Sequence, residues 1–120
     1  MFPVDLLATL QQASYPVILA PNAGLIVDCA RALHTHMPGS RFSLSTLELT
    51  LQGGIRVQGW TFRQAQKQAR GRVIDWLWSP VAPPKAVEAV IRPCFTGWDQ
   101  THPHLPHRWF SAPLEPAPDA

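Results

Sequence analysis

The stretch that decides the fold is residues 48–61, which read ELTLQGGIRVQGWT. Apolar and polar residues alternate on both sides of its Gly-Gly pair, and alternation with a period of two is typical of a half-buried strand. A Gly-Gly pair supplies the positive φ angles of a tight hairpin turn. The stretch therefore predicts an antiparallel hairpin over about residues 44–59, with residues 42–51 as its first strand.

The following residues, 62–78, read FRQAQKQARGRVIDWLW and predict a helix. Its apolar residues recur at intervals of three or four: Phe62, Ala65, Ala69, Val73 and Trp76. That spacing places them on one helix face, and Thr61 is a suitable N-cap. Gly71 weakens a helix by about 1 kcal/mol relative to alanine, so an earlier end near it is an open alternative.

Upstream of the hairpin the sequence predicts a helix, a strand and a second helix. Residues 4–13 carry leucines at near-helical spacing, and the apolar run PVILA at 16–20 is typical of a buried strand. Residues 23–36 fit a helix with Asn22 as its N-cap, which is the interpretation we favour. The alternative is that part of this segment forms the second strand of another hairpin.

Proline changes the character of the chain after Trp78, because nine of the thirteen prolines lie from Pro80 onward. We expect a short helix through KAVEAVI that ends at Arg92-Pro93. Beyond Gly97 the prolines predict no regular structure. Residues 97–120 are then either a disordered tail or an extended strap anchored by aromatic side chains. The anchors of such a strap would be Trp98, Trp109 and Phe110.

These elements predict an α+β fold, in which a small antiparallel sheet containing the hairpin packs against three or more helices on one face. We expect one domain over residues 1–96. Cys29 and Cys94 belong to no motif and are expected to be buried, reduced thiols of a bacterial-type cytoplasmic protein. No apolar run approaches the roughly 20 residues that a membrane span needs.

Positive charge is concentrated in one segment, although the net charge is only +2. Five of the ten basic residues fall close together: Arg56, Arg63, Lys67, Arg70 and Arg72. No acid lies between Glu48 and Asp75. Such a cluster is typical either of a phosphate-binding face, where Trp60 and Phe62 could stack on bases, or of a solvated face that can contact a protein.

Catalytic and metal-binding patterns are weak, so we predict no enzyme, no catalytic residue, no cofactor and no metal. The sequence lacks a nucleophile elbow, a phosphate-binding loop and a zinc-protease motif. His102, His104 and His107 could in principle bind zinc or copper. No cysteine or carboxylate pair accompanies them at the spacing of a metal-binding family.

The tryptophans point to a binding surface. Trp and Arg are the residues most enriched at interface hot spots, and charged residues make up only 15% of the chain, against about 25% in typical domains. The predicted binding residues are Arg56, Trp60, Arg63, Lys67, Arg70, Arg72 and Trp78. The alternative is that the C-terminal strap covers the tryptophans.

Two stretches resemble a known family: DLLATLQQASYPVIL followed by GLIVD, and LELTLQGGIRVQGWTFRQAQKQARGRVIDWL. A leucine-rich helix, then a hairpin, then a helix is similar to the small TubC-type N-terminal docking domains of nonribosomal peptide synthetases. The two stretches correspond to competing registers of that pattern, and the proline-rich C-terminus has no counterpart in it. The resemblance implies an α/β docking surface that recognises a partner's short helix or strand.

The sequence therefore predicts a non-enzymatic docking or adaptor module that binds a protein partner or a second copy of itself. The hairpin edge, the basic helix and exposed tryptophans would form its surface. The alternative is a small nucleic-acid-binding protein that lays the basic helix 62–72 along phosphates, with the hairpin as a wing. Neither hypothesis involves a membrane.

Overall fold

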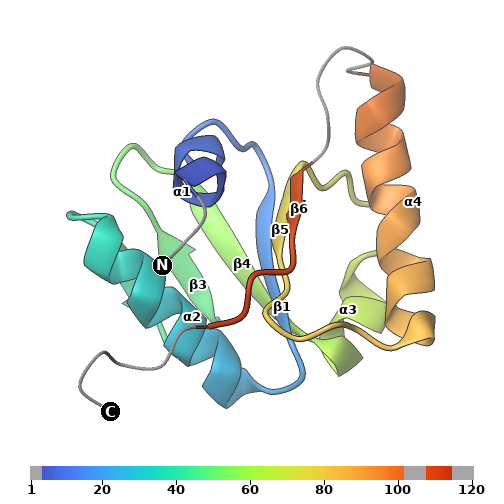
Figure 1. Ribbon diagram of the computed structural model, residues 1–120, viewed down its shortest axis with the longest axis horizontal. Coiled ribbons are helices and arrows are strands. Elements are labelled where there is room, and N and C mark those ends of the chain that lie inside the picture. Colours follow the sequence, from blue (N-terminus) through green and yellow to red (C-terminus); the bar gives the residue numbers. More distant parts are fainter. Residues whose placement is uncertain (1–3, 102–107, 115–120) are drawn as a thin grey trace.

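The computed structural model describes residues 4–101 and 108–114 of the chain. Within these residues six strands form one mixed sheet in the order β2-β3-β4-β1-β5-β6, and four helices pack on it (Figure 1). The elements are α1 (Val4–Leu10), β1 (Pro16–Ala20), α2 (Ala23–His36), β2 (Arg41–Ser43), β3 (Glu48–Thr50), β4 (Arg56–Thr61), α3 (Phe62–Gln68), β5 (Trp76–Trp78), α4 (Lys85–Thr101) and β6 (Arg108–Phe110).

The sheet is mostly parallel, which corrects the predicted α+β class to α/β. The pairs β4-β1, β1-β5 and β5-β6 are parallel, and only β2-β3 and β3-β4 are antiparallel. The predicted small antiparallel sheet is therefore one end of a larger sheet. The strand at 16–20 is confirmed, and it is the strand on which β4 and β5 both pair.

Helices cover both faces of the sheet, so the prediction that they share one face is wrong. On the first face, α1 and α2 pack over a core that includes Ile18, and on the second face α3 and α4 pack over a core that includes Val17 and Leu19. All five residues of β1 are buried. A strand that is apolar on both sides needs cover on both sides, which is typical of a central parallel strand.

The predicted turn at Gly53-Gly54 is confirmed, with φ angles of 102° and 92°. The predicted single strand over 42–51 is wrong, because the chain turns between β2 and β3 and forms two consecutive hairpins. Leu47 adopts a positive φ of 52° in that turn. The leucines alternate only from Leu47 to Leu51, and the three-residue step from Leu44 to Leu47 coincides with this turn.

The predicted helix over 62–78 ends much earlier, because α3 stops at Gln68 and the chain then turns at Gly71 with a φ of 76°. Residues 76–78 instead form β5 beside β1. The buried carboxylate of Asp75 accepts hydrogen bonds from the backbone N–H groups of Ser14 and Tyr15, at 2.6 and 2.9 Å. These bonds tie the start of β5 to the start of β1.

The helix prediction for residues 23–36 is confirmed, since α2 has those bounds and Asn22 Oδ1 accepts from the Leu25 N–H at 2.9 Å. The predicted end of regular structure near residues 92–97 is wrong. Helix α4 continues through Pro93 and past Gly97 to Thr101, and β6 adds a strand beside β5.

Residues 111–114 follow β6 without regular secondary structure, and we call them the strap. Trp78 Nε1 donates to the Ala112 carbonyl at 2.7 Å, and Leu114 packs against the core of the first face. Trp109 stacks on Phe95 with ring centroids 5.5 Å apart. The strap therefore closes the first face between the end of β6 and α2 (Figure 1).

Candidate functional site

The short helix α3 presents the first part of the basic cluster. A capping box fixes its start, in which the Gln64 N–H donates to Thr61 Oγ1 at 3.1 Å and Gln64 Oε1 accepts from the Thr61 N–H at 3.0 Å. Ala65 is buried against the sheet, whereas Arg63 and Lys67 are exposed. The helix thus packs through a small residue and turns its cations to solvent.

Two further cations follow in the turn after α3, which corrects the prediction that they lie on the helix itself. Arg70 is exposed beside Gly71. Arg72 Nε donates to the Gln68 carbonyl at 3.2 Å, and its guanidinium lies 5.6 Å from the centre of the Tyr15 ring. We call the four side chains Arg63, Lys67, Arg70 and Arg72 the basic surface.

No acid of the described residues pairs with this basic surface. In the described part of the chain, no salt bridge or hydrogen bond joins any of its four side chains to a carboxylate. Asp75 is buried and occupied by backbone N–H groups. Glu88 on α4 pairs with Arg92 one turn away. Among the described residues, no acid therefore competes with an external partner for these four cations.

Arg56 does not belong to the same charge group. It lies at the start of β4, and its Nε is 3.7 Å from Glu48 Oε1 on the neighbouring strand. Gln58 Nε2 also donates to Glu48, across the same strand pair. Arg56 does line a hollow together with Tyr15, the residue on which Arg72 stacks. It is therefore a partly neutralised neighbour of the basic surface.

The structure contradicts the expectation that Trp60 and Trp78 are exposed. Trp60 is 4% exposed in the core of the second face, and Trp78 is fully buried in the core of the first. Trp60 contacts Tyr15, with ring centroids 6.2 Å apart. Neither indole can contact a partner while the fold is intact. Of the seven predicted binding residues, only the basic ones are exposed.

A groove that sequence reasoning missed lies beside the basic surface. Its volume is about 520 Å³, it is open on one side, and its walls are the turn after α3 and the facing side of α4. We call it the α3–α4 groove; its lining residues are Ala69, Arg70, Gly71, Arg72, Val73, Ala89, Val90, Pro93 and Cys94. Six of these carry apolar side chains, and two are cations of the basic surface.

Val73 is the residue of this groove that the sequence placed wrongly. It fits the apolar stripe of a long helix, yet 47% of it is exposed. The turn at Gly71 takes it off the helix and leaves it at the mouth of the groove. The only sequence signal for this position was Gly71, the residue at which an earlier helix end was an open alternative.

Cys94 fixes the floor of the groove. Its Sγ–H donates to the Ala69 carbonyl at 3.0 Å, and the Ile74 N–H donates to the Cys94 carbonyl at 3.3 Å. Burial raises the pKa of the Cys94 thiol above its ordinary value. Through its thiol and its carbonyl, Cys94 therefore joins α4 to the chain on both sides of the turn after α3.

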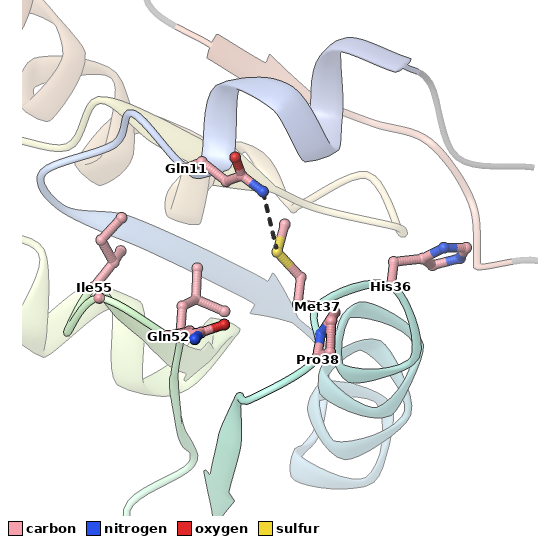
Figure 2. A pocket seen from close by; sticks show the side chains of 8 residues that line it. Gln11, His36, Met37, Pro38, Gln52 and Ile55 are labelled. Atoms are coloured by element: carbon pink, nitrogen blue, oxygen red, sulfur yellow. Dashed lines mark hydrogen bonds between the residues drawn. The ribbon is translucent and has the colours of Figure 1, made fainter.

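A second hollow lies between the ends of α1 and α2 and the hairpin turn (Figure 2). Gln11 and Met37 point toward each other in it, with 4.0 Å between Gln11 Nε2 and Met37 Sδ, while His36 points away from them. Its lining has amide and apolar groups but no Lys, Arg, Asp or Glu. It therefore lacks the charge that distinguishes the α3–α4 groove.

Candidate metal ligands and reactive side chains are present within residues 4–101 and 108–114. No group of three His, Cys, Asp or Glu side chains there is placed to hold a metal ion. His102, His104 and His107 lie outside these residues. On α2, the His34 imidazole contacts the Ser40 hydroxyl, with 2.5 Å between Nδ1 and Oγ. The Cys29 thiol of the same helix is fully buried, and its pKa is raised to about 12, first by burial and then by the charge of Asp28.

Among the described helices, none combines the length and the apolar character needed to cross a membrane. Comparisons with protein-family models, curated proteins and solved structures gave no match. The geometry of the basic surface and the α3–α4 groove is therefore the basis for a functional proposal.

Proposed function

We propose that this protein is a non-enzymatic docking module that binds a partner protein through the basic surface and the adjoining α3–α4 groove. The observation that carries the proposal is the contact between charge and apolar surface: Arg70 and Arg72 line the same groove as the exposed Val73. Protein interfaces combine apolar contacts with arginine and are depleted in lysine and acids.

The rigidity of the groove supports binding with low entropic cost. Arg72 is held by the Gln68 carbonyl and the Tyr15 ring, and the floor is held by the Cys94–Ala69 hydrogen bond. Preorganised side chains lose less conformational entropy when a partner binds. The docking role implied by the TubC-type resemblance is compatible with such a surface, but that family supplies no residue to the proposal.

A nucleic-acid-binding role is the second candidate, because Arg63, Lys67, Arg70 and Arg72 are exposed and unpaired with acids among the described residues. Clustered cations bind phosphates by releasing counterions. The buried Trp60 removes one of the two predicted base-stacking groups. Phosphate groups would also not contact the apolar side chains of the groove, so we rank this role second.

Affinity selection from a random peptide display library, with the full chain as bait, tests the docking role without a known partner. The matched control is the Arg63→Ala, Lys67→Ala, Arg70→Ala and Arg72→Ala variant. We expect enriched peptides that bind the natural chain and lose most of their affinity for the variant. Labelled duplex and single-stranded DNA form the second arm. Salt-sensitive DNA binding without peptide enrichment would overturn the docking role in favour of the second candidate.

A further inference from the structure

From the composition of the α3–α4 groove we infer the partner's chemistry: an acidic segment that inserts one large apolar side chain beside Val73 and places carboxylates on Arg70 and Arg72. This inference rests on the proposed docking function and deepens it. It follows from charge complementarity, from the apolar lining of the groove and from the geometry of its walls.

Charge complementarity selects an acidic occupant. Two guanidinium groups line the groove, two further cations lie on the adjacent helix, and the acids nearest in sequence are occupied elsewhere. A neutral segment would leave these cations without an acidic partner, and a basic segment would place like charges together, which opposes binding. Guanidinium groups also match carboxylates better than ammonium groups do, because they offer paired N–H donors in one plane.

The apolar lining of the groove calls for an apolar side chain of the partner in addition to its carboxylates. Val73 on one wall faces α4, whose Ala89, Val90 and Pro93 form the other wall. A partner segment that carried only carboxylate side chains would leave this apolar lining in contact with water. One inserted leucine, phenylalanine or similar side chain removes it from water, which is favourable at roughly 25 cal/mol per Å² of apolar surface.

Geometry favours a macromolecular segment over a small metabolite. The groove is open on one side rather than enclosed, and small ligands bury most of their surface in the pockets that hold them.

The probe that tests this inference is a labelled peptide with a single leucine flanked by aspartates, measured by fluorescence anisotropy against the full chain. Two control peptides replace the leucine by serine, or all aspartates by asparagines. We expect both controls to bind at least roughly tenfold more weakly, a difference equivalent to about 1.4 kcal/mol. Equal binding of the serine peptide would overturn the insertion of an apolar side chain.

Matched protein variants localise the site. Val73 and Val81 are 47% and 43% exposed, and only Val73 lines the groove. We expect Val73→Asp to weaken the leucine peptide roughly tenfold and Val81→Asp to change it less than twofold. Likewise, Arg70→Glu should abolish measurable binding, whereas Lys85→Glu, an exposed substitution outside the groove, should have little effect.

The outcomes separate failure of the inference from failure of the proposed function. If the peptide binds and depends on Arg63 and Lys67 but not on Val73, docking stands and the groove is not the site. If no acidic peptide binds and labelled DNA does, the docking function itself fails. Circular dichroism of each variant confirms that a loss of binding is not a loss of fold.

Discussion

The two faces of the sheet are covered in different ways. On the first face, the indole N–H groups are used inside the fold: Trp76 Nε1 is 3.2 Å from the Leu6 carbonyl, and Trp78 Nε1 is 2.7 Å from the Ala112 carbonyl of the strap. On the second face, α3 is only seven residues long, and the turn after it leaves the α3–α4 groove open.

The difference teaches which face is available for function. On the first face, Trp76 and Trp78 are fully buried beneath α1, α2 and the strap, and the hollow between α1 and α2 has no Lys, Arg, Asp or Glu in its lining. The second face combines a core of similar character with a partly exposed valine at its margin and with cations that pair with no acid of the described residues. Substitutions on the first face should therefore change stability, and substitutions at the groove should change binding with little change in stability.

The largest effect should come from Gly59→Ala, which tests how tightly the first face is packed. A Cβ at residue 59 would lie 2.5 Å from Ile26 Cγ2 and 2.7 Å from the Leu47 carbonyl oxygen, so the backbone or α2 would have to shift. We expect a loss of about 3 kcal/mol in the free energy of unfolding, measured by urea denaturation.

Gly24→Ala is the matched control for that substitution. Its added Cβ would meet only Asn22 Oδ1, at 3.3 Å, and alanine favours the helix. We expect its free energy of unfolding to stay within about 1 kcal/mol of the natural chain. A Gly59→Ala protein as stable as this control would show that α2 is not packed closely on β4.

The second prediction compares a tryptophan from each face. Trp78→Phe removes buried volume and leaves the Ala112 carbonyl without its donor, so we expect a loss of about 2 kcal/mol. Trp60→Phe removes similar volume, but the Trp60 indole donates to no described residue. Its cost should be about 1 kcal/mol. Equal costs in thermal unfolding would contradict the role of the strap in closing the first face.

The third prediction concerns pH and the Cys29 thiol on the first face. Burial and the nearby Asp28 raise its pKa to about 12 in the folded protein, against about 8.5 in an unfolded chain. The contribution of this thiol to the free energy of unfolding is constant below about pH 8.5. It declines as the pH rises toward 12, because over that range only the unfolded chain releases the thiol proton. The decline should approach about 1.4 kcal/mol per pH unit.

Urea denaturation of the natural chain and of Cys29→Ala, at a series of pH values above 8.5, measures this decline. The variant lacks the thiol, so its stability should fall less steeply across that window. Cys94→Ala is the comparison from the second face. Its effect on the slope should be smaller, since burial raises the pKa of Cys94 without a neighbouring carboxylate. Parallel slopes in all three proteins would contradict the assignment to Cys29.

The smallest effect should come from Val73→Ala at the mouth of the groove. Because Val73 is 47% exposed, we expect its free energy of unfolding to change by about 0.5 kcal/mol or less. Val87→Ala is the contrast, because Val87 of α4 is 1% exposed in the core of the second face; it should cost about 2 kcal/mol. A large loss for Val73→Ala would mean that the groove is a structural contact rather than a binding surface.

Local signals in the sequence predicted several elements well. The Gly-Gly turn, the N-cap at Asn22, the helix of residues 23–36 and the apolar strand of 16–20 all depend on neighbouring residues alone. The exposed cations of the site were also visible, since charge without nearby acids is a property of the chain. These predictions succeeded because backbone turns, caps and short apolar runs act over a few positions.

Other features required tertiary contacts that no local pattern contains. The stretch from Val73 to Trp78 satisfies helical periodicity, yet the bonds from Ser14 and Tyr15 to Asp75 hold its end as a strand beside β1. The burial of Trp60 and Trp78 depends on α3, α4 and the strap, which meet the sheet from distant parts of the chain.

The sequence alone thus determined the turn at Gly53-Gly54, which segments are apolar and where positive charge collects, because those properties reside in neighbouring residues. Only the tertiary structure decided that the sheet is mostly parallel, that helices cover both of its faces, and that Val73 and the arginines line one groove. Parallel pairing joins strands that are far apart in the chain, so its energy comes from contacts between segments rather than from any one of them.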